Sequence, residues 1–313
     1  LHSHVLFKPL SVGRIFILKT KLPELGKLKQ VKLLLVFSMK FLASLILFCL
    51  LYLSISHYMH DLDQIVTREH VIHLEDTKLD GLNIGVVGDL HFSRQDDLQK
   101  IEVISEQMED KEIDLIFLVG DYIGDRSLLE TVSRASIIEK LAALSSIAPT
   151  FAVLGNHENW DDHSAWTDAI EGSSIYLVEG KVLETTARGE LICVRGLGDL
   201  YSDYWSDVEI PKQCTGSTIT LTHDPNGLLQ KIPNSVETLS FAGHTHCGQV
   251  WLPFLTRFLV PSNAPTELHC GKFTLGSSGV VTGGVGTSIL PVRLGRGMEP
   301  AWEYVAISMP DGP

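Results

Sequence analysis

Five short motifs in the sequence each place metal-competent side chains directly after an apolar run. They are GDLH at residues 88–91, GD at 120–121, GNHE at 155–158, THD at 222–224 and GHTH at 243–246. Imidazole nitrogens and carboxylate or amide oxygens are donors that suit Mn, Zn or Fe, and the set contains no thiolate. A single motif of this kind usually lies in a solvated loop, but five in one chain indicate a shared site. Divalent cations in such a site activate water and stabilise negative charge on a substrate.

The apolar runs of the first half predict the elements that must position the first three motifs. Residues 82–87, 114–119 and 150–154 read as buried strands, and residues 97–108 and 127–145 have helical spacing without internal Gly or Pro. Alternating strands and helices imply parallel strands joined by right-handed crossovers. The carboxyl ends of such strands share one edge of the sheet, where open α/β sheets place their sites.

The second half of the chain predicts a second sheet. After residue 175 the apolar strands follow one another with little helix between them, which indicates another sheet packed on the first in a layered α/β sandwich. The expected strands span residues 175–178, 191–195, 217–222, 238–242, 249–251, 280–282 and 302–307.

Charge and cysteine content exclude several classes of protein. The 313 residues include 25 Lys and Arg against 38 Asp and Glu, a formal net charge of −13. Residues 1–60 carry eight basic side chains and one Glu, which leaves −20 for the remainder. Such an acidic body repels phosphate backbones, so we expect no nucleic-acid partner. The five cysteines form no CxxC pair and are too few and too scattered to predict a disulfide scaffold, so the redox compartment stays open.

Residues 41–58 form an apolar segment without Lys, Arg, Asp or Glu. Its length is compatible with a membrane anchor or with a cleaved signal segment, and the absence of an Ala-x-Ala site favours the anchor. Residues 1–40 are a basic N-terminal extension. Because Met39 directly precedes the apolar run, residues 1–38 are interpreted as a translated upstream region or an unusual extension. We expect a linker at residues 59–79 and a cell-membrane location, with the side of the membrane left open.

The order of the five motifs resembles the calcineurin-like metallophosphoesterase superfamily over residues 80–310. GHTHCGQVWLP at 243–253, GVGTSILP at 284–291 and Arg293 are similar to a bacterial membrane-tethered branch of small phosphodiesterases, which includes UDP-2,3-diacylglucosamine hydrolase-like members. Cys247 and the Met-Glu-Pro order at 298–300 depart from that branch. The resemblance implies an α/β fold, a four-layer α/β/β/α sandwich of two mixed sheets, preceded by one N-terminal hydrophobic segment.

The resemblance also implies a centre with two divalent metal ions, Mn, Zn or Fe. One ion would be held by Asp89, His91 and His246, and the other by Asn156, His223 and His244. Asp121 would bridge both ions, because a charged oxygen ligand can hold two cations close together. His157 would be the catalytic residue that stabilises or protonates the leaving group. Glu158 and Asp224 would orient a ligand histidine through hydrogen bonds.

The substrate class follows from one further departure. Leu154 stands where protein Ser/Thr phosphatases of this superfamily carry an arginine before GNHE. A monoester with two negative charges needs that arginine more than a diester does, so we expect cleavage of a phosphodiester or pyrophosphate bond.

The apolar anchor and several aromatic side chains favour a membrane-resident lipid substrate, whereas packing of the aromatics in the core is the alternative. These side chains are Trp160, Trp166, Tyr201, Tyr204, Trp205, Trp251 and Phe254. Related enzymes of the branch imply a phospholipid or a nucleotide-lipid such as UDP-2,3-diacylglucosamine of lipid A biosynthesis. A phosphomonoesterase or protein phosphatase, a nuclease and a non-catalytic membrane-tethered scaffold are the alternative functions. The oligomeric state stays open.

Overall fold

The computed structural model describes residues 32, 34, 36–49, 51–52, 61–124, 132–206, 208–230, 239–252, 254–288 and 290–310. The chain divides into two units, Leu1–His57 and Tyr58–Pro313. In the first unit the described residues are helical and their side chains are exposed. Among the described residues, no helix combines the length and the apolar character needed to cross a membrane. The expected anchor at 41–58 lies partly outside the described residues, and so does most of the basic extension.

The first sheet of the second unit carries the three strands predicted from the first half of the sequence. β2 is parallel to β3 and β3 to β4, as expected, whereas β12 is antiparallel to β2. The order across the sheet is β1 (Val66–His73), β12 (Ala301–Ser308), β2 (Asn83–Val87), β3 (Leu115–Leu118), β4 (Thr150–Ala152) and β5 (Tyr176–Leu177). Strands β3 and β4 are buried on both faces, which explains their continuous apolar sequences.

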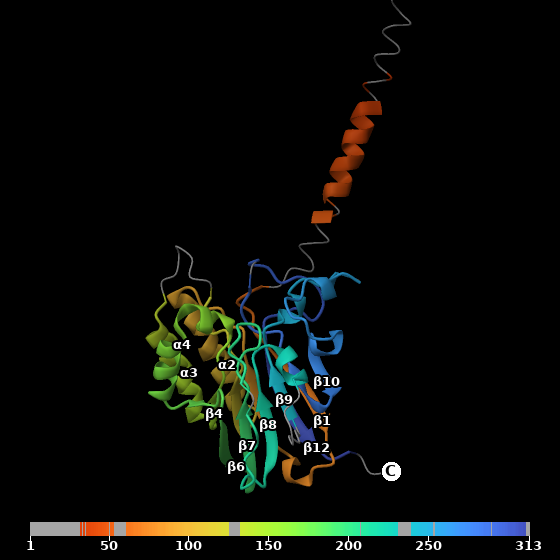
Figure 1. Cartoon of the computed structure of the whole chain (residues 1–313). Helices are drawn as coiled ribbons and strands as arrows, with labels where there is room; N and C mark the ends of the chain where they lie inside the picture. Colours follow the sequence, from red (N-terminus) through yellow and green to blue (C-terminus); the bar gives the residue numbers. More distant parts are fainter. Residues whose placement is uncertain are drawn as a thin grey trace, which may run out of the picture. The chain divides into compact units, whose positions relative to one another are not determined.

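The second sheet has the same mixed character. Its central strands β7, β8, β9 and β11 are parallel, and β6 and β10 join the two edges in antiparallel orientation (Figure 1). The order is β10 (Gly271–Leu275), β11 (Ser277–Val281), β9 (Leu239–Ala242), β8 (Ser217–Leu221), β7 (Glu190–Gly196) and β6 (Val182–Ala187). The rings of Phe117 on β3 and Phe241 on β9 lie 5.4 Å apart, within the apolar core between the two sheets.

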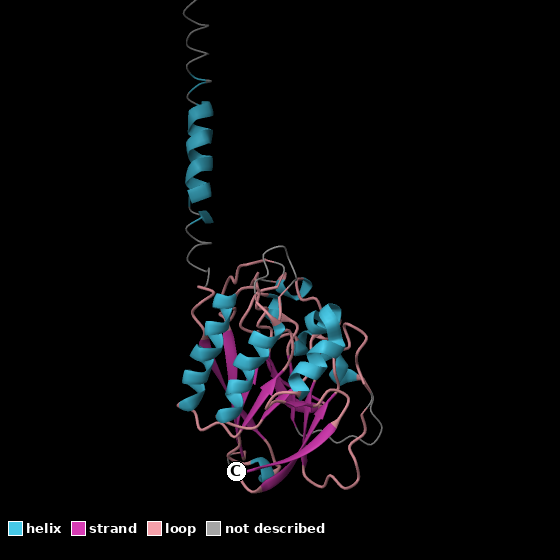
Figure 2. Cartoon of the chain, turned by 90° about the vertical axis from the view of Figure 1, so that its left-hand side faces the viewer, coloured by secondary structure: helices cyan, strands magenta, loops and turns pink. Residues whose placement is uncertain are grey.

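Three α-helices cover the outer face of the first sheet, and Figure 2 shows them from that side. They are α2 (Gln99–Glu109), α3 (Arg134–Ala143) and α4 (Asn156–Glu171). Ile104, Ile137 and Trp166 from these helices share one core with β3 and β4. Trp166, expected among the exposed aromatics, is fully buried there.

The expected fourth layer is not helical in the part of the chain that the structure describes. A smaller apolar cluster on the second sheet joins Phe273 and Val281 to Ala264 and Leu268, from a segment with short 3-10 turns. The 3-10 turns on this side are η4 (Pro225–Leu229), η5 (His246–Gly248), η6 (Thr256–Phe258) and η7 (Thr266–Leu268). The two mixed sheets are therefore confirmed, whereas the outer helical layer of the second sheet is absent from the described residues.

Two further expectations were wrong, and three elements were not predicted. Residues 66–73, expected within a linker, form the edge strand β1, which pairs in parallel with β12. Residues 249–251, expected as a strand, make only an isolated bridge from Val250 to Leu294. Strands β6 and β10 and helix α4 were not predicted, because exposed polar residues interrupt their apolar periodicity.

The cysteines are paired more than the sequence suggested. Disulfides join Cys193 to Cys214 and Cys247 to Cys270, across 21 and 23 residues of sequence. Neither pair has the CxxC spacing, because each joins cysteines that are distant in sequence and come together only in the folded protein. The second pair lies beside the GHTH motif.

Candidate metal centre

All eight residues proposed for the centre meet at the carboxyl ends of five strands. Asp89 and His91 follow β2, Asp121 follows β3, and Asn156 and His157 follow β4 at the start of α4. His223 follows β8, and His244 and His246 follow β9. Ligand atoms within 4.8 Å of one another form three groups: Asp89–His91–His246, His91–Asp121–His157 and Asp121–His223–His244.

The first group has the spacing of ligands that share one cation. The Nε2 atoms of His91 and His246 lie 2.9 Å apart, and His246 Nε2 lies 3.6 Å from Asp89 Oδ1. Ligand atoms placed about 2.0–2.2 Å from one ion are separated by about this much. The backbone N–H of His244 donates to both Asp89 oxygens, at 2.9 and 3.1 Å, and so fixes the carboxylate.

On the other side of the centre, His223 and His244 form a second ligand group around Asn156. The Oδ1 of Asn156 lies 2.9 Å from His244 Nδ1 and 3.2 Å from His223 Nε2. The Nδ1–H of His223 donates to the Val119 carbonyl at 2.7 Å, which leaves Nε2 directed into the centre. This hydrogen bond selects the ring orientation in which His223 can act as a ligand.

Asp121 lies between the two groups. Its Oδ2 is 3.5 Å from His91 Nε2 on one side and 3.2 Å from His223 Nε2 on the other. Its Oδ1 accepts the backbone N–H of His157 at 3.0 Å, which fixes the carboxylate at the start of α4. The arrangement suits a carboxylate shared by two cations.

The backbone at the centre is strained. Five of the seven proposed ligands have a positive φ: Asp89 49°, His91 49°, Asp121 55°, His244 69° and His246 49°. Few residues other than glycine adopt this conformation, and it costs about 1–3 kcal/mol at each position. Position 155, next to the proposed ligand Asn156, requires glycine, because an added Cβ there would collide with the Asp121 carboxylate. Strain concentrated at the ligands is typical of a functional site.

Glu158 has a different role from the one expected. Its carboxylate accepts four backbone N–H groups, from Asp121, Tyr122, Ile123 and Gly155, at 2.8–3.0 Å. It therefore holds the loop that carries Asp121, and it contacts no ligand histidine through these bonds. Asp224 was also expected to orient a histidine, but it accepts hydrogen bonds from Asn226 N and Ser262 Oγ.

The electrostatics of the centre favour cations. Burial raises the pKa of Asp89 to about 7 and lowers the pKa of His91 to about 3. Burial also lowers the pKa of His246, and positively charged neighbours lower it further. At His223 burial opposes protonation, but the contact with Asp121 raises its pKa well above the usual value. His91 and His246 are therefore neutral beside the buried carboxylates, and their nitrogens can donate to a cation, so the donor set fits divalent metal ions.

His157 borders this centre on its more open side. Its Nε2 lies 3.9 Å from Asp121 Oδ2, and its ring packs edge-on against His91 with centroids 4.5 Å apart. The residue is only partly buried, whereas Asp121, His223 and His246 are buried. It can therefore contact a substrate that approaches the centre.

A polar cleft of about 410 Å³ opens over His91 and His157. Arg94 and Lys100 also line this cleft, and neither residue was proposed from the sequence. Leu154, in contrast, is fully buried in the core against the helices, so this position contributes no group to the cleft. Arg293 lies behind the centre, where its Nη2 is 3.4 Å from His246 Nδ1 and 2.8 Å from the Gly283 carbonyl.

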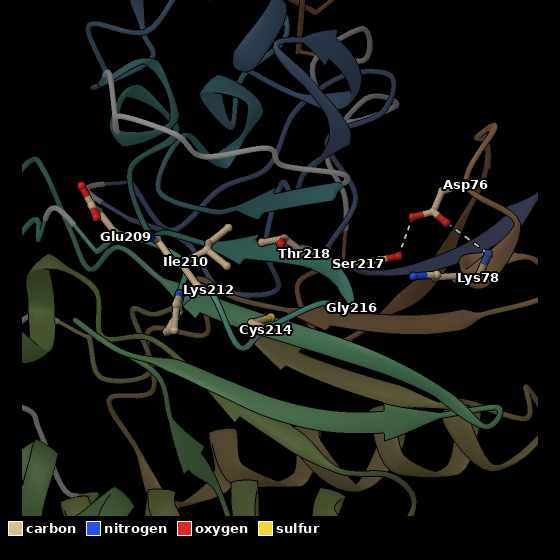
Figure 3. Close-up of a pocket in the computed structure, with 10 residues that line it drawn as sticks. Asp76, Lys78, Glu209, Ile210, Lys212, Cys214, Gly216, Ser217 and Thr218 are labelled. Atoms are coloured by element: carbon tan, nitrogen blue, oxygen red, sulfur yellow. Dashed lines mark hydrogen bonds between the residues drawn. The ribbon is translucent and has the colours of Figure 1, made fainter.

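A second pocket, of about 470 Å³, lies at the amino end of β8 rather than at the centre (Figure 3). Asp76 accepts hydrogen bonds there from the Ser217 hydroxyl and the Lys78 backbone. Cys214 on its wall is disulfide-bonded. Its side chains, among the described residues, do not form a metal-ligating group.

Comparison with known proteins identifies a family that matches this chain. A family model described as calcineurin-like phosphoesterase matches residues 82–248. The metallophosphoesterase YkuE of Bacillus subtilis is 27% identical over 242 residues, which cover 73% of this chain and 81% of that protein. Phosphodiesterase YaeI of Escherichia coli is 29% identical over 188 residues, 56% of this chain and 64% of the relative.

A relative from Danio rerio, a transmembrane protein with metallophosphoesterase domain, is 25% identical over 238 residues. The match covers 71% of this chain and 52% of the relative, so the chain spans about half the length of that protein.

Proposed function

The chain belongs to the calcineurin-like phosphoesterase family, and from that premise we propose that it hydrolyses a phosphodiester or pyrophosphate bond at a centre of two divalent metal ions. One observation carries the proposal: Asp121 Oδ2 lies 3.2–3.9 Å from nitrogens of three histidines, between two groups of ligand atoms. One relative is named a phosphodiesterase, which supports this reaction class.

The ligands divide between the two sides of Asp121. Asp89, His91 and His246 would hold one ion, and Asn156, His223 and His244 would hold the other. Mn, Zn and Fe all accept this set of imidazole and oxygen donors. When bound, such ions would supply neutralisation of charge on the phosphoryl group and a lowered pKa of a water molecule.

The chain's own groups then orient the substrate and handle the proton. His157, on the open side of the centre, stabilises or protonates the departing oxygen. Arg94 and Lys100 on the wall of the cleft are paired with Asp97, and Lys100 also with Asp63, so these side chains leave the cleft polar without a net positive charge.

A diester fits this cleft better than a monoester. Leu154 is buried and supplies no guanidinium to the metal centre, which supports a diester, with one negative charge, over a monoester, with two. Five of the aromatic side chains named above are exposed, including Trp160, Tyr201 and Trp251. With the apolar segment 41–58 as an anchor, they support a membrane-resident lipid or nucleotide-lipid substrate, such as UDP-2,3-diacylglucosamine.

The purified full chain, reconstituted with Mn²⁺ or Zn²⁺, should hydrolyse bis-p-nitrophenyl phosphate with a higher kcat/KM than p-nitrophenyl phosphate. Chelation should abolish both activities, and added metal should restore them. A preference for the monoester would favour the phosphomonoesterase alternative. Tight metal binding without hydrolysis of either ester would favour the non-catalytic scaffold.

A further inference from the structure

An apolar cavity of about 220 Å³ lies beside the metal centre. Val250, Leu259, Pro261 and Leu290 line it, and its polar wall includes His246. His246 is a proposed metal ligand, so the cavity and the centre share one side chain. A ligand bound at the metals could therefore extend directly into apolar surroundings.

The cavity also adjoins the polar cleft. Ser288 lines both spaces, and His91, on the wall of the cleft, lies 2.9 Å from His246 on the wall of the cavity. The two spaces thus flank the same pair of histidines. A molecule with an anionic phosphoester and an apolar chain has matching surroundings for each part.

The apolar surface extends outward from the cavity onto the neighbouring loop. Phe254 is 92% exposed and Phe258 69% exposed, and Trp251 and Leu255 are about half exposed. The guanidinium of Arg257 lies 4.7 Å from the centroid of the Phe258 ring. Exposed aromatic side chains that cluster with a cation are typical of surfaces that meet lipid head groups and acyl chains.

We propose that this cavity binds an acyl or alkyl chain of the phosphoester substrate, and that Leu259 and Leu290 are its main specificity-determining residues. The proposal rests on the proposed function, because it places the scissile phosphoester at the metal centre. The metal centre would take the phosphoester, and the apolar lining of the cavity matches the chain. Leu259 and Leu290 are about half exposed, so the cavity is open to a chain from outside.

The test uses a series of alkyl phosphates, from butyl to decyl, and the full chain in lipid nanodiscs with empty nanodiscs as the blank. Isothermal titration calorimetry gives Kd for each ligand. Each added methylene should lower Kd about two- to fourfold until the cavity is filled. Leu259→Asp and Leu290→Asp should remove this dependence on chain length, because each places a charge beside the chain.

Leu275→Asp is the matched control, since Leu275 is exposed on β10 and does not line the cavity. It should keep the parent chain-length dependence. A Kd that does not vary with chain length, or a dependence that survives both cavity variants, would overturn the inference. Hydrolysis of bis-p-nitrophenyl phosphate is measured on the same samples. Hydrolysis together with a Kd that does not depend on chain length contradicts only the role of the cavity. A Kd that depends on chain length without hydrolysis contradicts only the proposed function.

Discussion

The Glu158 carboxylate accepts the backbone N–H of Asp121 at 2.9 Å, and so joins the first turn of α4 to the strand end that carries the central ligand. The same carboxylate accepts three further backbone N–H groups, and it is fully buried. Asp121 in turn accepts the N–H of His157. The two carboxylates thus hold β3 and α4 in the arrangement that the metal centre requires.

Replacing Glu158 should damage both stability and metal binding. Glu158→Gln places an amide N–H₂ against two backbone N–H groups and leaves them without acceptors, at about 1–3 kcal/mol for each. We expect thermal unfolding to show a loss of several kcal/mol, together with weaker binding of both metal ions. Glu190→Gln, on an exposed residue, is the control and should change neither property. An unchanged metal affinity in a folded Glu158→Gln protein would contradict this role.

His157→Ala should slow catalysis while leaving the metals bound. We expect a loss on the order of 10²–10⁴ in kcat for an alkyl leaving group that needs a proton. The loss should shrink for p-nitrophenol, which leaves as an anion. His163→Ala is the control on the same helix, because His163 hydrogen-bonds to Asn159, which is not a proposed metal ligand. This variant should keep the parent kcat. An equal loss for all leaving groups, or loss of metal, would exclude the assigned role.

The contribution of Glu179 to the stability of the metal-free protein should fall as the pH rises. Burial raises its pKa to about 7 from 4.5, so the folded state holds a proton there that the unfolded state releases above about pH 4.5. Stability from this group is therefore lost between about pH 4.5 and 7, by on the order of 3 kcal/mol. Urea unfolding should show that Glu179→Gln flattens the profile in this window, whereas Glu190→Gln keeps the parent slope. The same slope in both variants would contradict the assignment.

The two disulfides should differ in their effect on the centre. They close loops of similar length, so removal of either should cost about 3 kcal/mol of stability. Only the Cys247–Cys270 disulfide is attached to the loop that carries His246. In the same loop, the Thr245 hydroxyl donates to the carbonyl of His269, next to Cys270, at 2.7 Å. Cys247→Ala with Cys270→Ala should therefore weaken metal binding about tenfold. Cys193→Ala with Cys214→Ala should lower only the Tm, and equal metal affinities in the two double variants would refute the distinction.

Much of the fold could be predicted because its central strands carry continuous apolar sequences. β2, β3 and β4 are buried on both faces, and their runs stand out without any knowledge of their neighbours. β1 could not be found in this way, since four of its eight residues are half-buried and polar residues fill positions 67–70. Its place depends on pairing with β12, which is more than 230 residues away.

The ligand positions could be predicted because strand-end motifs in parallel sheets converge on one edge. The supporting contacts could not. Glu158 lies two residues after the proposed ligand Asn156, yet its partners are backbone N–H groups of the β3 loop, which carry no sequence signal. Arg94 and Lys100 reach the cleft only through the turn and helix after β2, and the cavity of Leu259 and Leu290 combines two distant loops.

Metal analysis of the folded Asp121→Ala protein tests the central claim most directly. The parent chain should contain about two divalent ions, and His246→Ala about one, since it lacks one ligand of a single ion. Asp121→Ala should lose both ions while circular dichroism shows a retained fold, and Asp96→Ala, on an exposed residue, should retain both. Two tightly bound ions in Asp121→Ala would contradict a metal centre bridged by this carboxylate.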